Sequence, residues 1–147
     1  MTPGAAFSGA KLAILTRGRV LTLLRDEFVD IPYPGHWDLP GGGREGDETP
    51  QACVLRELRE ELSLRLRPGD LIWRREYTSS HAGALPSWFF AAELPWINPA
   101  GIYLGDEGQA WRLMPVPQFL SHPKAVPHLA ERLQRYLETR DLGRASV

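Results

Sequence analysis

The sequence contains a single cysteine, Cys53, among its 147 residues. One thiol cannot form an internal disulfide, so nothing indicates a secreted, disulfide-stabilised domain. No stretch approaches the roughly 18 consecutive apolar residues of a membrane-spanning helix. The N-terminal residues also lack the basic segment and long apolar run of a signal peptide. These absences predict a cytoplasmic protein with no membrane partner.

The chain also lacks a strong charge of either sign. Seventeen basic and eighteen acidic side chains leave a net charge of −1, which argues against binding to duplex nucleic acid or to an anionic membrane. The composition, 43% hydrophobic and 24% charged, is typical of a globular domain. At this length we expect one domain over residues 1–147, with a core from about 10 to 140. Composition predicts no particular oligomeric state.

What the sequence does contain is centred on residues 42–64, a glycine-rich turn that runs into a helix. Thr49 is a good N-cap and Pro50 a good first helical residue. With about 100° of rotation per residue, an apolar stripe follows on one face of the helix. Its members are Val54, Leu55, Leu58 and Leu62.

Three carboxylates lie on the neighbouring face of this predicted helix. Glu57, Glu60 and Glu61 are spaced i, i+3 and i+4, so their like charges repel. A cluster of hard oxygen ligands suits Mg²⁺ or Mn²⁺, and a bound ion would remove the repulsion. The spacing alone favours the other interpretation, a solvated helix that is supported by pairs such as Arg56–Glu60.

The remaining elements follow from short patterns. Arg17-Gly18 separates two β-rich runs and predicts a hairpin, whereas the prolines of residues 28–36 predict a loop. Leucines at i, i+4 and i+8 (Leu129, Leu133, Leu137) predict a closing helix, followed by a frayed tail after Asp141. The expected strands are 11–16, 19–24, 71–77, 87–94 and 111–116, with a polar loop around 79–86, an irregular connection over 95–105 and the closing helix over 122–140.

A longer pattern decides between the two interpretations of the carboxylate helix. Residues Gly42 to Leu64 resemble the Nudix box, G-x5-E-x7-R-E-U-x-E-E-x-G-U, where U is a bulky aliphatic residue. Eight of its nine fixed positions match, and Ser63 stands where the family has glycine. Residues 37–43, WDLPGGG, are similar to the W-x-x-P-G-G segment that precedes the box, and residues 105–111 resemble the E-G-Q…W segment of MutT-type members.

The resemblance implies the α/β (α+β) Nudix fold, a mixed β-sheet sandwiched between helices. It also implies Mg²⁺-dependent hydrolysis, with Mn²⁺ as an alternative, of a diphosphate linkage in a nucleoside diphosphate linked to another moiety. The expected substrate is a (d)NTP or modified nucleotide, which would give the monophosphate and pyrophosphate. Two alternatives stay open: a pyrophosphatase for ADP-ribose or another nucleotide sugar, and a domain that binds a nucleotide without hydrolysing it. The stretch 122–127 offers no amide side chain to recognise 8-oxoguanine, and residues 77–80 lack the proline of ADP-ribose pyrophosphatases.

The resemblance also implies roles for individual residues of the site. The resemblance implies a metal site formed by the Gly41 carbonyl and the carboxylates of Glu57, Glu60, Glu61 and Glu107. It implies an orienting role for Arg56, which we expect to point away from Glu57 and to brace Glu60 or the loop glutamate Glu48. The general base is left open among Glu57, Glu60 and Glu107.

Substrate contacts are expected from Arg25, Gly42 and Glu48. Arg25 follows a predicted strand and matches the basic residue that approaches the substrate phosphates in MutT-type enzymes. Its alternative role is a surface ion pair with Asp26 or Glu27.

Ser63 leaves two alternatives for the end of the helix. Either it adopts the left-handed conformation at a cost of roughly 1 kcal/mol, or the helix continues to Arg65.

Overall fold

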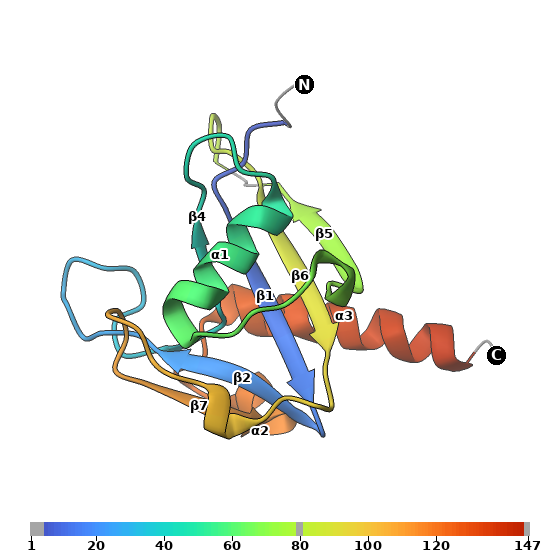
Figure 1. Cartoon of the computed structure of the whole chain (residues 1–147). Coiled ribbons are helices and arrows are strands. Elements are labelled where there is room, and N and C mark those ends of the chain that lie inside the picture. The colour runs from blue at the N-terminus through green and yellow to red at the C-terminus, as the bar shows by residue number, and fades with distance from the viewer. Residues whose placement is uncertain (1–4, 79–80, 146–147) are drawn as a thin grey trace.

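The computed structural model describes residues 5–78 and 81–145, which form one mixed sheet with helices on both faces (Figure 1). The main strand order is β3-β2-β1-β6-β5, with β4 paired to β1 and β7 paired to β2. Only β1 and β6 run parallel; the other pairs are antiparallel. The strands are β1 Gly9–Thr16, β2 Arg19–Leu24, β3 Trp37–Asp38, β4 Gly41–Gly43, β5 Trp73–Tyr77, β6 Ser87–Glu93 and β7 Ala110–Pro115.

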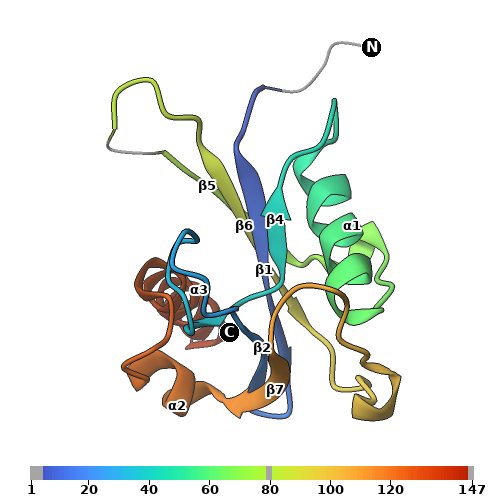
Figure 2. The same ribbon diagram turned by 90° about the vertical axis from the view of Figure 1, so that its left-hand side faces the viewer.

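Helices cover the two faces of the sheet separately, as the view in Figure 2 shows. Helix α1 (Pro50–Leu62) packs its buried Val54, Leu58 and Leu62 against one face. Helices α2 (Val116–Ser121) and α3 (Pro127–Ala145) cover the other face with a second apolar cluster. This arrangement confirms the expected mixed sheet between helices. In the part of the chain described, no helix is long and apolar enough to cross a bilayer.

The predicted hairpin and the predicted start of the carboxylate helix are both confirmed. Arg17 and Gly18 both have positive φ, at 51° and 78°, as a tight hairpin turn between β1 and β2 requires. The Thr49 hydroxyl accepts the Ala52 N–H at 3.2 Å, and Pro50 is the first residue of α1.

The closing helix expected over 122–140 is present, but its bounds are wrong because it begins at Pro127. Val116, expected to end the last strand, instead begins the separate helix α2, and residues 122–126 form the turn into α3. Prolines at 123 and 127 explain the break, because proline favours the first turn of a helix and disfavours helical conformation in the residue before it. The tail after Asp141 was expected to fray, but α3 continues through Ala145.

Other expected boundaries shift slightly. The strand expected over 71–77 begins at Trp73, after a short 3₁₀ turn at Pro68–Asp70, and the irregular connection over 95–105 contains a second such turn at Pro99–Gly101. Two of the residues in the predicted polar loop, Ser79 and Ser80, lie outside the described residues. The glycine triplet is not only a turn, since Gly41–Gly43 pairs with Gly9–Lys11 as strand β4.

Ser63 ends α1 in the left-handed conformation, with φ 59° and ψ 23°, so the first of the two alternatives holds. We expect Ser63→Gly to raise the free energy of unfolding by about 1 kcal/mol, because glycine has no Cβ to strain this conformation. Urea denaturation would measure the change. Ser63→Ala is the matched control and should bring no gain, since alanine keeps the Cβ; equal stabilisation by both variants would contradict the explanation.

Candidate active site

An open cleft of about 460 Å³, which we call the carboxylate chamber or simply the chamber, lies where α1, β4 and the loop after residue 105 meet. Glu57 and Glu61 of α1 line it together with Gly41 and Gly42 of β4 and with Glu107 from the loop. Arg25 lines it from the end of β2. The structure therefore brings six of the nine predicted site residues to one place, and leaves Glu48, Arg56 and Glu60 outside its lining.

Two glycines let the carboxylates approach the backbone. A Cβ on Gly41 would clash with the Ala10 carbonyl of β1, and its φ of 135° also favours glycine. The Gly41 N–H donates to Glu61 Oε1 at 2.8 Å. A Cβ on Gly42 would lie 2.7 Å from the Glu57 carboxyl carbon. Gly42 thus provides the space in which the Glu57 carboxylate lies, whereas Gly41 lets β4 lie against β1 and donates its N–H to Glu61.

The loop that carries Glu107 is also fixed against α1. The Gly105 N–H donates to the Glu61 carbonyl at 2.8 Å, and a Cβ on Gly105 would clash with the Glu60 carbonyl. At the other end of the loop, the Gly108 N–H donates to Asp26 at 3.0 Å. These contacts hold the loop, and with it Glu107, between α1 and the residues that follow β2.

Arg56 connects the predicted residues that do not line the chamber. Its guanidinium donates to both carboxylate oxygens of Glu48, at 2.7 and 3.1 Å, and to the Gly43 carbonyl at 2.9 Å. It also donates to Glu57 and Glu60, each at 3.0 Å. The expectation that Arg56 points away from Glu57 is wrong, because its long side chain turns back along the helix surface. The predicted braces to Glu60 and Glu48 are both present.

A second charge cluster, which was not recognised from the sequence, also lines the chamber. The Lys11 ammonium donates to Asp38 Oδ2, Leu39 O and Gly41 O at 2.9, 3.2 and 3.1 Å. Arg25 donates to the same Asp38 oxygen at 2.8 Å, so it does not form the ion pair with Asp26 or Glu27 that was its alternative role. The available signal was a lysine within the otherwise apolar run of residues 9–15.

Burial sets the protonation of the two carboxylates on α1. Desolvation raises the pKa of Glu61 to about 7, although the Gly41 N–H and the Lys11 charge act in the opposite direction. Desolvation also raises the pKa of Glu57, against the hydrogen bond from Arg56, and the charges of Glu60 and Glu107 add to the rise. Both carboxylates are therefore less stable in their charged form than they would be in water, and a nearby positive ion would reverse this.

The donor set fits a hard divalent cation. Carboxylate and carbonyl oxygens line the chamber, and no histidine or cysteine is among its lining residues. The raised pKa values of Glu57 and Glu61 show that nearby donors do not fully offset the burial of these two carboxylates. Among residues 5–78 and 81–145, no three Asp, Glu, His or Cys side chains converge closely enough to hold an ion as they stand. Arg56 donates to Glu57, and the Gly41 N–H donates to Glu61. Metal binding would therefore require the two glutamate side chains to rotate.

The pKa of Glu61 predicts how stability depends on pH in the absence of metal. Because the folded-state pKa of about 7 exceeds the ordinary value of 4.5, the folded chain binds the proton more tightly. The resulting stabilisation is complete below about pH 4.5 and is lost as the pH rises through 7, a change of roughly 3 kcal/mol. Urea denaturation in EDTA should therefore show wild type losing stability relative to Glu61→Gln over this range. Parallel pH profiles for the two proteins would contradict the assignment.

Fold and site together define an α/β domain with a carboxylate-bearing helix against a glycine-rich strand. The chain belongs to the NUDIX domain family, whose model matches residues 9–136. Over nearly its whole length the fold is similar to that of the MutT protein from Methanosarcina mazei Go1, with a TM-score of 0.70 and 20% identity over 93% of this chain and 99% of that one.

Two curated relatives match over shorter segments. An RNA pyrophosphohydrolase from Acidiphilium cryptum is 44% identical over 57 residues, which are 37% of this chain and 34% of the relative. The nucleoside triphosphatase NudI from Enterobacter sp. strain 638 is 53% identical over 34 residues, 23% of this chain and 24% of that protein. The matches thus span about a third or less of these relatives.

Proposed function

We propose that this chain hydrolyses a diphosphate linkage in a nucleoside diphosphate-X substrate with the help of Mg²⁺. The favoured substrate is a (d)NTP or a modified nucleotide, giving the monophosphate and pyrophosphate. The observation that carries the proposal is the chamber itself, which is lined both by the carboxylates Glu57, Glu61 and Glu107 and by the cations Lys11 and Arg25. A polyphosphate with bound divalent ions has the matching distribution of charge.

The carboxylates of Glu57, Glu61 and Glu107 and the Gly41 carbonyl would hold the metal, with Glu60 at the exposed edge of the site. When bound, Mg²⁺ neutralises phosphate charge and lowers the pKa of a coordinated water. Arg25 and Lys11 would donate to phosphate oxygens that enter the chamber. Asp38 keeps both cations in place, because its buried Oδ2 accepts from each of them and its Oδ1 accepts the Leu39 N–H at 2.7 Å.

Arg56 serves as a positioning residue in this proposal. It holds Glu57, Glu60 and Glu48 in one network without lining the chamber, which agrees with an orienting role and not with a phosphate contact. The general base remains one of Glu57, Glu60 and Glu107. The position of Glu57 and Glu107 in the chamber favours these two.

The names of the partial relatives support the reaction class. One is named a nucleoside triphosphatase and the other an RNA pyrophosphohydrolase. Both names describe the hydrolysis of a phosphate anhydride in a nucleotide or RNA. The segment shared with this chain is short in each case, so the chamber remains the main support.

A substrate panel tests the proposal. Purified protein with Mg²⁺ would be incubated with the common NTPs and dNTPs, oxidised nucleotides, ADP-ribose and nucleotide sugars, and ³¹P NMR would identify the products. We expect turnover that EDTA abolishes, with a monophosphate and pyrophosphate as products from a triphosphate. Binding of nucleotides without turnover of any panel member would instead support the non-catalytic alternative.

A further inference from the structure

A second pocket, of about 310 Å³, adjoins the carboxylate chamber on the face of the sheet that α3 covers. We call it the basic pocket. Its polar side chains are Lys11, Ser8, Ser87, His128 and Arg132, and the backbone of Gly42 and Gly43 forms the wall toward the chamber. None of its lining residues is acidic. The pocket therefore presents hydrogen-bond donors and two cations, of which Lys11 is already paired with Asp38 outside the pocket lining.

Arg132 is the least compensated cation of this pocket. Its guanidinium stacks on the Tyr77 ring at 4.2 Å from the centroid and donates to Ser87 Oγ at 3.3 Å. In the described parts of the chain it forms no ion pair with a carboxylate. Burial lowers the pKa of Arg132, against weaker contributions from Tyr77 and Glu131. A half-buried cation without a counter-ion is unfavourable, and an anionic ligand would remove that cost.

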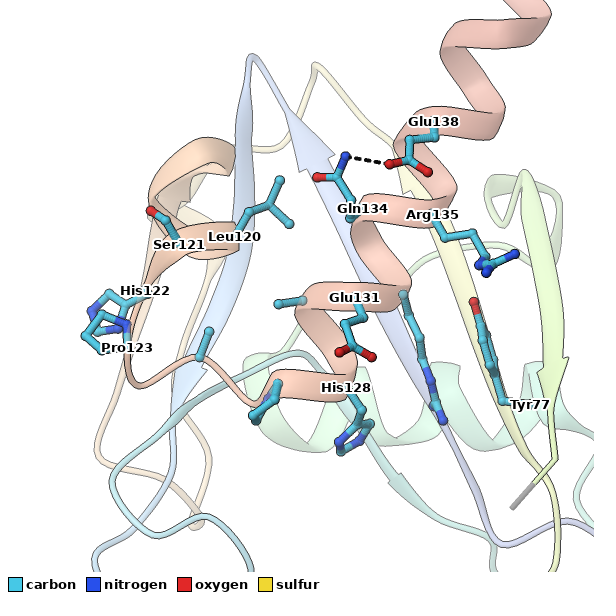
Figure 3. A pocket seen from close by; sticks show the side chains of 14 residues that line it. Tyr77, Leu120, Ser121, His122, Pro123, His128, Glu131, Gln134, Arg135 and Glu138 are labelled. Atoms are coloured by element: carbon cyan, nitrogen blue, oxygen red, sulfur yellow. Dashed lines mark hydrogen bonds between the residues drawn. The ribbon is translucent and has the colours of Figure 1, made fainter. Parts of the chain in front are cut away.

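A polar atom beside Arg132 also lacks a partner. The Tyr77 hydroxyl is buried and makes no hydrogen bond with any described residue. Tyr77 lines a larger groove of about 810 Å³ along α3, which shares His128 and Arg132 with the basic pocket. Figure 3 shows Tyr77 and Arg135 on one flank of α3, with Ser121 and His122 beyond the other flank. The basic pocket therefore adjoins the larger groove at His128 and Arg132 of α3.

The basic pocket and the chamber are close enough to hold parts of one ligand. They share Lys11, Gly42 and Gly43. In the sheet, Gly42 pairs with Ala10 and Ala10 pairs with Trp88, so β1 alone separates the glycine strand from the start of β6. Two strand spacings amount to about 10 Å. A nucleotide whose polyphosphate occupies the chamber can thus place another group of its own near Arg132.

We propose that the basic pocket binds a phosphate ester that the substrate carries outside the hydrolysed diphosphate. The inference rests on the proposed function for its substrate, a nucleoside 5′-polyphosphate, and adds that the preferred members carry a further phosphate on the ribose. That phosphate is either the monoester of a 3′-phosphorylated mononucleotide or the first diester of a short oligonucleotide. Arg132 donates to its oxygens, with the Ser87 hydroxyl beside it. The larger groove along α3 also includes Arg132 in its lining, and it offers room for the chain of a diester to continue.

Binding without metal and without turnover tests the pocket by itself. Calorimetric titration in EDTA would compare AMP, GMP, CMP and UMP with the corresponding nucleoside 3′,5′-bisphosphates and with 5′-phosphorylated dinucleotides. We expect the added phosphate to tighten binding about 10- to 100-fold for at least one base, as a charged hydrogen-bonded contact does. The dinucleotide arm separates diester from monoester recognition. Equal affinity with and without the added phosphate, or no detectable binding of either class, would overturn the proposal.

Variants of α3 sharpen the test. Arg132→Gln should reduce the gain from the added phosphate to within about 2-fold and leave the affinity for the simple monophosphates unchanged, whereas Arg132→Lys should keep part of the gain. Arg135→Gln is the matched control, because Arg135 lies on the same helix but does not line the basic pocket. If Arg135→Gln removes as much of the gain as Arg132→Gln, general surface charge and not the pocket is responsible. Thermal unfolding of each variant would verify that it folds.

The outcome is separable from that of the proposed function. If the Arg132-dependent preference appears but no nucleotide is hydrolysed, the pocket stands and the hydrolase proposal fails. If nucleotides are hydrolysed but the added phosphate and Arg132→Gln leave KM unchanged, the hydrolase proposal stands and the pocket fails.

Discussion

Replacing Glu57 with glutamine is expected to lower the kcat of Mg²⁺-dependent nucleotide hydrolysis by roughly 10³-fold. Glu57 lines the chamber beside Gly42, so its carboxylate is placed to bind a metal ion there. Glutamine keeps the shape of the side chain and an oxygen that accepts the hydrogen bond from Arg56. The fold should therefore persist while the metal site loses a ligand.

A stability measurement separates this explanation from simple unfolding. Because desolvation raises the pKa of Glu57, the neutral glutamine should not destabilise the protein in EDTA at neutral pH. Wild type should gain more stability from added Mg²⁺ than the variant does. Glu76→Gln, on the exposed edge strand β5, is the control and should match wild type in both measurements. Near-normal kcat in Glu57→Gln would show that the ion lies elsewhere.

The same substitution at Glu60 and Glu107 would resolve the general base. The family resemblance implies metal-site roles for both residues, but Glu60 is half exposed and bound to Arg56, whereas Glu107 lines the chamber. We expect all three variants to lose activity. The general base should show in the pH profile of kcat, because its replacement removes the acidic limb and leaves a slow, pH-independent reaction.

Replacing Arg56 with glutamine is expected to reduce the free energy of unfolding by about 3 kcal/mol in EDTA. The Arg56 side chain is only 13% exposed, and it is the common partner of Glu48, Glu57 and Glu60. Its hydrogen bonds to Glu48 and Glu57 hold the pKa of the guanidinium far above the ordinary value, so Arg56 stays charged at any pH of interest. Without it, the remaining carboxylates repel one another beside a low-dielectric core.

Two comparisons make the Arg56 prediction specific. Arg56→Lys should recover less than half of the lost stability, because an ammonium cannot reach both oxygens of Glu48 and the Gly43 carbonyl together. Arg59→Gln is the control on the same helix. Arg59 forms no ion pair within the described residues, so its loss should change stability by less than about 0.5 kcal/mol. Equal losses for Arg56→Gln and Arg59→Gln in urea denaturation would refute the role of Arg56 as the centre of the network.

The parts of the fold that follow local rules could be predicted from the sequence. The turn at Arg17-Gly18, the cap at Thr49 and the apolar stripe of α1 each depend on residues close in the chain, and each is confirmed. Strand β4 could not be predicted in this way. Three glycines have no intrinsic preference for a strand, and Gly41–Gly43 is extended because β1 pairs with it. The later start of the closing helix could have been predicted from Pro123 and Pro127, because the leucine period does not mark where the helix begins.

The site, like the fold, contains some residues that the sequence predicts and others that only tertiary packing brings together. The spacing of Glu57 and Glu61 on a helix and their distance from Gly42 are properties of the sequence, and the chamber brings these residues together as expected. Lys11 and Asp38 were missed because they are 27 positions apart and meet only when β1 passes beside the segment between β3 and β4. That Arg132 has no ion-pair partner among the described residues could not be predicted either. Whether a cation forms an ion pair depends on tertiary packing and not on its neighbours in the chain.

The most direct test of the proposed function is a crystal structure with Mn²⁺ and a non-hydrolysable nucleoside triphosphate analogue, with the ions located by anomalous scattering. We expect at least one Mn²⁺ coordinated by carboxylates of Glu57, Glu61 and Glu107, with the polyphosphate between the ion and the side chains of Lys11 and Arg25. Mn²⁺ bound outside the chamber, or an analogue that binds with its phosphates away from these carboxylates, would contradict it.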